Sequence, residues 1–169
     1  MKVVAVRGRS NSGKTETIVA LVRELRRRGY SVVAAKDVHQ EGFSIDTPGK
    51  DSARLAEAGG EAVVIRAEAE TSFVYRRRLA AEEIVACIAA DFLVLEGFRD
   101  LPCANLACAR ELVELRREIN EQTIAISGVV ASSLGTYEGV PAVSALTEAG
   151  RLADMVEAEA TEVAPRHPG

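Results

Sequence analysis

The sequence contains no tryptophan, and only 4% of its residues are aromatic. Proteins that bind single-stranded nucleic acid stack bases on aromatic side chains, so the shortage of such rings argues against that function. The formal net charge of −4 argues in addition against a protein that holds nucleic acid by charge alone. We therefore expect no nucleic-acid partner.

Cysteine and histidine are also scarce, with three and two residues respectively. The cysteines, Cys87, Cys103 and Cys108, form no C-x-x-C pair, and two histidines offer little to complete a metal site. We interpret the three cysteines as free thiols that are buried or half-buried.

Long apolar runs are missing as well. No stretch approaches the roughly 20 apolar residues that a helix needs to span a bilayer. The apolar part of the opening MKVVAVRG is too short for a signal peptide. We expect a cytoplasmic protein with no membrane partner.

Short apolar runs and helical patterns alternate along the chain. Apolar runs without polar alternation are typical of parallel strands covered on both faces. We expect one nucleotide-binding domain over residues 1–160 and a flexible C-terminal tail over 161–169. The expected strands are 2–7, 30–36, 61–67, 71–77, 91–97, 104–109, 123–130 and one within 139–145, and the expected helices are 14–28, 51–59, 80–90, 110–119 and 146–160.

The junction between the first strand and the first helix matches the phosphate-loop pattern G-x-x-x-x-G-K-[ST] in full. Its members are Gly8, Arg9, Ser10, Asn11, Ser12, Gly13, Lys14 and Thr15. Glycines let successive N–H groups face one point, and the helix N-terminus adds further donors to an anion. Lys14 would reach the β- and γ-phosphates of a nucleotide, and the Thr15 hydroxyl would bind Mg²⁺. The pattern predicts an α/β fold of the P-loop NTPase class, with a mostly parallel sheet and helices on both faces.

Glu16 follows the motif directly. Its carboxylate would lie beside the α-phosphate of a bound nucleotide. A carboxylate suits an empty helix N-terminus, but it repels a phosphate there. We count Glu16 among the candidate nucleotide contacts and infer modest affinity from it.

Further charged residues follow the ends of other predicted strands. Because ligands of open parallel sheets bind outside the carboxyl ends of the strands, these residues are candidates for the same site. Glu96 ends an apolar strand, as a Walker B acid does, so we expect it to hold Mg²⁺ or its water and to take part in catalysis with Lys14. The loop after the second strand contributes Lys36, His39, Asp46 and Lys50. The alternative for each of these residues is an ordinary solvated charge.

Four blocks of the sequence resemble the molybdopterin-guanine dinucleotide biosynthesis protein B family, MobB. They are GRSNSGKTETI, KDVHQEGFSIDTPGKDS, LVLEGF and TIAISG. The second block is the most specific, with Lys36 and His39 followed by Asp46, Gly49 and Lys50. Two positions differ from the family pattern: Asp37 stands where a histidine is common, and Glu16 stands where a hydroxyl residue is common.

The resemblance implies a small homodimeric protein that binds GTP with Mg²⁺ and hydrolyses it weakly. It also implies a partner, the MobA-type nucleotidyltransferase that joins GMP to molybdopterin, and a possible molybdopterin ligand. By position, residues 8–15 would hold the phosphates, Glu96 would sit near the metal, and Lys36, His39, Asp46 and Lys50 would line the same site.

The residues alone leave other functions open. An ATP-dependent small-molecule kinase or ligase would have the same architecture, and so would a regulatory nucleotide switch without a metabolic substrate. No N-K-x-D signal for guanine is present, although SGVVASS and YEGVPAVS follow late strands and offer backbone groups to a base. GTP is therefore implied by the resemblance only.

Overall fold

The central sheet is built from the apolar runs. In the computed structural model, which describes residues 1–45, 49 and 51–164, β1 (Lys2–Gly8) lies between β5 (Phe92–Glu96) and β6 (Asn105–Cys108). β2 (Val32–Lys36) and β7 (Thr123–Ser127) extend it to the order β2-β5-β1-β6-β7. All neighbours in this order are parallel, so the predicted parallel sheet is confirmed.

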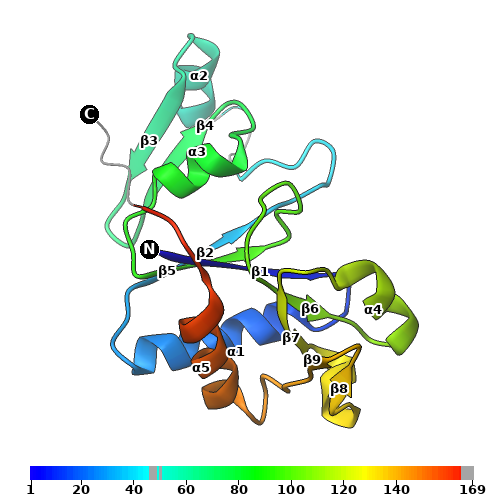
Figure 1. The fold of residues 1–169 in the computed structure, drawn as a ribbon. Coiled ribbons are helices and arrows are strands. Elements are labelled where there is room, and N and C mark those ends of the chain that lie inside the picture. Colours follow the sequence, from blue (N-terminus) through cyan, green and yellow to red (C-terminus); the bar gives the residue numbers. More distant parts are fainter. Residues whose placement is uncertain (46–48, 50, 165–169) are drawn as a thin grey trace. The chain divides into compact units, whose positions relative to one another are not determined.

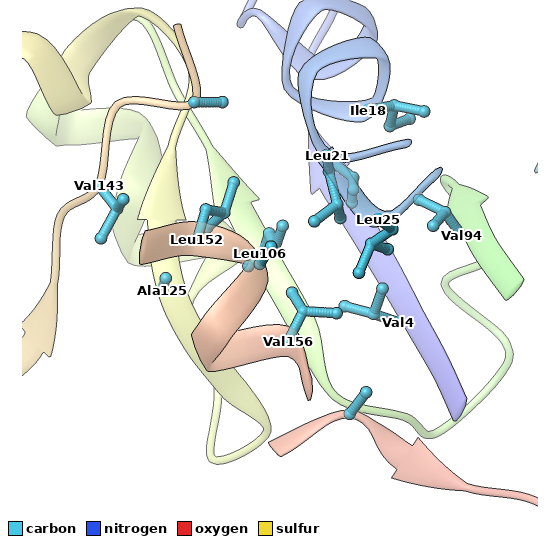
Figure 2. Packing of buried hydrophobic residues seen from close by; sticks show 14 of the residues in the cluster. Val4, Ile18, Leu21, Leu25, Val94, Leu106, Ala125, Val143, Leu152 and Val156 are labelled. Carbon is cyan, nitrogen blue, oxygen red and sulfur yellow. The ribbon is translucent and has the colours of Figure 1, made fainter. Parts of the chain in front are cut away.

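Two helices pack on one face of this sheet, α1 (Lys14–Arg27) and α5 (Ala149–Glu159) (Figure 1). Their apolar residues recur at helical spacing and point toward alternate residues of the strands, which makes one continuous core (Figure 2). This core includes Ile18, Leu21 and Leu25 of α1, Leu152 and Val156 of α5, and Val4, Val94, Leu106 and Ala125 of the strands.

The opposite face is covered by α4 (Leu112–Glu118), whose Leu115 packs with Ala107 and Ile126. Helices on both faces are therefore confirmed. The 3₁₀ helix η1 (Val129–Ser133) and the short antiparallel pair of β8 (Thr136–Tyr137) and β9 (Val140–Pro141) follow β7.

The chain beyond α5 begins with an ordered strand. β10 (Thr161–Glu162) pairs antiparallel with Lys2 and Val3 of β1, where β1 has no pairing with β6. The segment 161–169, expected as a flexible tail, is thus part of the sheet at its start. Backbone hydrogen bonds to β1 form this strand. The sequence did not predict it, because a strand of two residues has no recognisable pattern.

The structure divides the chain into two compact units, and the second, Val38–Glu83, is described by itself. It holds α2 (Asp51–Glu57) and the antiparallel pair of β3 (Ala62–Arg66) and β4 (Thr71–Tyr75), and α3 (Ala81–Ala86) begins in it. Val63 is buried, whereas the cross-strand neighbours Val64 and Phe73 are exposed. The single domain expected over 1–160 stays a prediction, because a division by contacts does not test whether either unit folds alone.

Several elements end earlier than predicted. α3 stops at Ala86, short of the expected residue 90, and β7 stops at Ser127, because Gly128 turns the chain with φ of 76°. The burial expected of all three thiols holds for Cys103 and Cys108 but is wrong for Cys87, which follows the short α3 and is exposed. Among the described residues, no helix is long and apolar enough to cross a membrane.

Candidate functional site

The phosphate-loop motif lies where its pattern predicts, between the end of β1 and the start of α1. Gly13 is the N-cap residue of α1, with φ of 90°, and no side chain caps the helix there. Helix geometry leaves the N–H groups of Lys14, Thr15 and Glu16 without intrahelical acceptors. An uncapped first turn of this kind is suited to an anion.

Gly8 is required by a close approach between neighbouring strands. A Cβ atom built on Gly8 would lie 2.2 Å from the carbonyl oxygen of Cys108 in β6. No larger residue fits without moving backbone. After Gly8 the chain leaves the sheet, and Arg9, Ser10 and Asn11 are exposed, with Asn11 in the left-handed region at φ of 60°. The loop therefore stands free of the core from Arg9 to Asn11 and returns to it at Ser12.

Lys14 folds back over the loop. Its Nζ donates a hydrogen bond of 2.7 Å to the carbonyl oxygen of Arg9, so the ammonium group lies above the turn that would hold a phosphate. Thr15 and Glu16 are exposed in the first turn of α1. A phosphate would have to draw the Lys14 ammonium away from a neutral carbonyl acceptor, and charge favours that exchange.

Glu96 lies at the same edge of the sheet. It is in register with Val6 of β1 and with Lys36 of β2, and its carboxylate lies 3.2 Å from the Lys36 ammonium. The Glu96 side chain is 14% exposed, whereas that of Lys36 is 59% exposed. Val6 belongs to the core under α1, so register places Glu96 on the face of the sheet that carries α1.

The chain that follows Glu96 is tied down on both sides. Arg7 of β1 is buried, and its Nη2 donates to the carbonyl oxygen of Leu101 at 2.7 Å. The Arg99 guanidinium pairs with the nearly buried Glu118 of α4 at 2.6 Å. These contacts hold the segment that follows β5 against β1 and α4.

Three predicted site residues remain, namely His39, Asp46 and Lys50. His39 is exposed and belongs to the second unit. Asp46 and Lys50 lie outside the described residues. Their role stays a prediction.

A polar cluster under the loop was not predicted. The Thr17 hydroxyl lies 3.2 Å from the Ser127 hydroxyl at the end of β7. The Cys108 thiol donates to the Thr17 hydroxyl at 3.6 Å. Burial raises the pKa of the Cys108 thiol to about 12, so this thiol is a structural group and no nucleophile at neutral pH. The sequence signal that could have predicted this cluster is the Ser127-Gly128 pair, because it ends an apolar strand at the same edge of the sheet as the phosphate loop.

The donors at this edge fit a nucleotide phosphate and Mg²⁺ chemically. Backbone N–H groups and Lys14 suit phosphate oxygens, and the Thr15 hydroxyl and the Glu96 carboxylate are oxygen ligands of the kind that Mg²⁺ prefers. Over the described part of the chain, no group of three or more His, Cys, Asp or Glu side chains is gathered that could hold a metal ion. Mg²⁺ at this edge would depend on the phosphates and water for most of its ligands.

Comparisons with known proteins agree with this architecture. Residues 3–132 match the family model MobB, molybdopterin guanine dinucleotide synthesis protein B. A molybdopterin-guanine dinucleotide biosynthesis adapter protein of Haemophilus influenzae is 28% identical over 132 residues, which are 74% of this chain and 73% of the relative. A relative from Methanocaldococcus jannaschii, provisionally given the same adapter role, is 29% identical over 103 residues. That match covers 59% of this chain and 42% of the archaeal protein.

Solved structures show the same fold. The crystal structure of Bacillus subtilis MobB superposes with a TM-score of 0.75 at 23% identity, covering 95% of this chain and 99% of that one. The MobB homolog from Bacillus stearothermophilus superposes with a TM-score of 0.68 at 18% identity, covering 94% and 99%. These superpositions confirm the predicted P-loop NTPase fold, and the match to the family model confirms the predicted resemblance to MobB.

Proposed function

The chain belongs to the MobB family, and on that premise we propose that it is a GTP-binding adapter protein in the synthesis of molybdopterin guanine dinucleotide. The observation that carries the nucleotide part of the proposal is the uncapped start of α1 behind a complete phosphate-loop motif, with Lys14 folded over it. The adapter part rests on the names of the relatives.

In this proposal the phosphate loop holds the β- and γ-phosphates of GTP, and Lys14 moves from the Arg9 carbonyl to them. Thr15 and Glu96 take part in holding Mg²⁺, which would neutralise the phosphate charge. Lys36, which pairs with Glu96, keeps a positive charge at the same edge.

Hydrolysis of GTP is proposed to be slow. Glu96 is the acid that register brings to the edge, and it is already engaged by Lys36. A fast GTPase needs a residue that is free to orient the attacking water, and a carboxylate that is paired with an ammonium group is less available for that role.

The proposed partner is a MobA-type nucleotidyltransferase, with molybdopterin as a possible further ligand. We also propose a homodimer, as the family resemblance implies. The exposed apolar side chains on β3 and β4, among them Val64 and Phe73, are surface of the kind that association covers. We propose that the protein acts in the cytoplasm.

Titration calorimetry of the purified chain with Mg²⁺–GTP and Mg²⁺–ATP in parallel tests the nucleotide. We expect GTP to bind more tightly than ATP. Lys14→Ala should weaken GTP binding by about 1.5–3 kcal/mol, because a charge-assisted phosphate contact is lost. Lys2→Ala is a control, since Lys2 lies at the opposite end of β1.

Equal affinity for ATP and GTP would favour the kinase or ligase alternative. Unchanged GTP affinity of Lys14→Ala would remove the phosphate-loop assignment. Co-purification with a MobA-type nucleotidyltransferase, with and without GTP, tests the adapter role separately.

A further inference from the structure

The end of β7 lies against the phosphate loop at a distance that only glycines allow. A Cβ atom on Gly128 would lie 2.1 Å from the carbonyl oxygen of Ser12, and one on Gly13 would lie 2.9 Å from the Cα of Gly128. Both glycines have positive φ, 76° for Gly128 and 90° for Gly13. Two turns from distant parts of the chain thus meet backbone to backbone.

Hydrogen bonds join these two turns. The Val129 N–H donates to the Ser12 carbonyl at 3.1 Å, and the Val130 N–H donates to the Ala109 carbonyl beyond β6 at 3.0 Å. Beneath them, the hydroxyls of Ser127 and Thr17 lie 3.2 Å apart. The turn after β7 is therefore attached to the phosphate loop, to α1 and to the end of β6.

Ser12 has few other attachments. Its side chain is fully buried, but its hydroxyl has no hydrogen-bond partner among the described residues. Its own N–H makes only a long bond of 3.4 Å to the Arg9 carbonyl. The bond from Val129 holds the carbonyl of the Ser12–Gly13 peptide, and that peptide leads directly into the N–H groups that would face a phosphate.

We propose that Ser127, Gly128 and Val129 are positioning residues for nucleotide binding, acting through Ser12 and Gly13. This inference rests on the proposed nucleotide function and adds residues to it. A displaced loop would aim its N–H groups away from the phosphate oxygens, and a misaligned hydrogen bond to a charged group is weaker than a well-aligned one.

Gly128→Ala tests the proposal, and Gly139→Ala is its matched control. Gly139 also has a positive φ, 81°, but a Cβ atom there would meet nothing within 4 Å. Both variants place a Cβ atom at a residue of positive φ, and only Gly128→Ala pushes on Ser12. Ser127→Ala is a milder third variant that removes the contact with the Thr17 hydroxyl.

Two readouts are needed in the full chain, each at a temperature well below the unfolding midpoint of the variant. The first is the hydrogen-exchange rate of amides 10–14 without nucleotide. The second is Mg²⁺–GTP affinity by calorimetry. We expect Gly128→Ala to raise the exchange rate and to weaken affinity by about tenfold or more, and Ser127→Ala to do the same to a smaller degree. Gly139→Ala should change neither readout.

A folded Gly128→Ala variant with wild-type exchange and wild-type affinity would overturn the proposal. The same holds if its unfolding temperature falls while both readouts stay at their wild-type values. If Gly128→Ala does not fold, Ser127→Ala decides by the same two readouts, and wild-type values would then overturn it. If the wild-type chain binds no nucleotide, the proposed function fails. In that case, faster exchange of amides 10–14 in Gly128→Ala would still support the role of these residues in positioning the phosphate loop. Unchanged exchange would overturn that role.

Discussion

Burial differs sharply between the strands of the two compact units. In the first unit, every residue from Phe92 to Leu95 and from Asn105 to Cys108 is buried, because helices cover both faces of the sheet. In the second unit, β3 and β4 expose Val64 and Phe73, at 56% and 68%. The phosphate loop is therefore attached to a sheet whose strands cannot shift without disrupting core packing, whereas the two-stranded sheet exposes apolar side chains.

The largest expected effect is on stability. Leu21→Ala removes a fully buried side chain of α1 and should lower the free energy of unfolding by about 2–5 kcal/mol. Phe73→Ala in the second unit should change it by less than about 0.5 kcal/mol at protein concentrations where the chain is a monomer, since the ring is exposed in a single chain. Urea unfolding of both variants measures the contrast. A large loss for Phe73→Ala in the monomer would contradict the difference in burial, whereas a loss that appears only at high protein concentration would show that a second copy covers the ring.

The next effect concerns chemistry at the edge of the first unit. Glu96→Gln should reduce the rate of GTP hydrolysis on the order of 100-fold, with a much smaller change in affinity, because the phosphate loop is intact. Asp91→Asn is the control: Asp91 precedes the same strand at its opposite end, where its carboxylate accepts from the Ser31 N–H and hydroxyl. Equal losses of rate and affinity in Glu96→Gln would assign Glu96 a structural role.

A smaller effect is expected where α1 meets α5. The Arg28 guanidinium bonds to Glu24, Asp154 and Glu157 and to the Gly150 carbonyl, whereas Arg27 bonds to Glu24 alone among the described residues. Arg28→Ala should lower the free energy of unfolding by about 1–2 kcal/mol, and Arg27→Ala should lower it less. Thermal unfolding of the two variants ranks them, and the reverse order would contradict the role given to Arg28.

Acid should weaken the same contact. The Arg27 and Arg28 guanidiniums hold the pKa of Glu24 at about 2, below its ordinary value of 4.5. The stabilisation from Glu24 is therefore complete above pH 4.5 and is lost as the pH falls toward 2. Glu24→Gln should show a smaller loss of stability over this range than the wild type.

The smallest effect asks whether the second unit responds to nucleotide at all. We expect hydrogen exchange of residues 38–45 to slow when Mg²⁺–GTP binds, because this glycine-containing segment follows β2 at the edge of the sheet that carries the phosphate loop. His39→Ala should weaken binding slightly. Unchanged exchange, together with wild-type affinity of His39→Ala, would confine the nucleotide site to the first unit.

Local sequence was sufficient for the phosphate loop and the parallel sheet. Gly8, Gly13, Lys14 and Thr15 stand at set spacings between an apolar strand and an amphipathic helix, and both elements formed where the pattern predicted them. Apolar runs buried on both faces require covering helices, which is why the layer arrangement could also be predicted. The position of Glu96 at the same edge followed from strand direction alone.

Tertiary structure alone decided which side chains and turns meet. The Lys36–Glu96 pair depends on the register of β2 beside β5, and the approach of Gly128 to Gly13 depends on β7 lying beside β6. The division after Asp37 and the pairing of β10 with β1 also come from long-range contacts. The spacing of residues along the chain predicts helices, strands and turns. It does not predict which distant segments pack together, because those contacts form only when the whole sheet assembles.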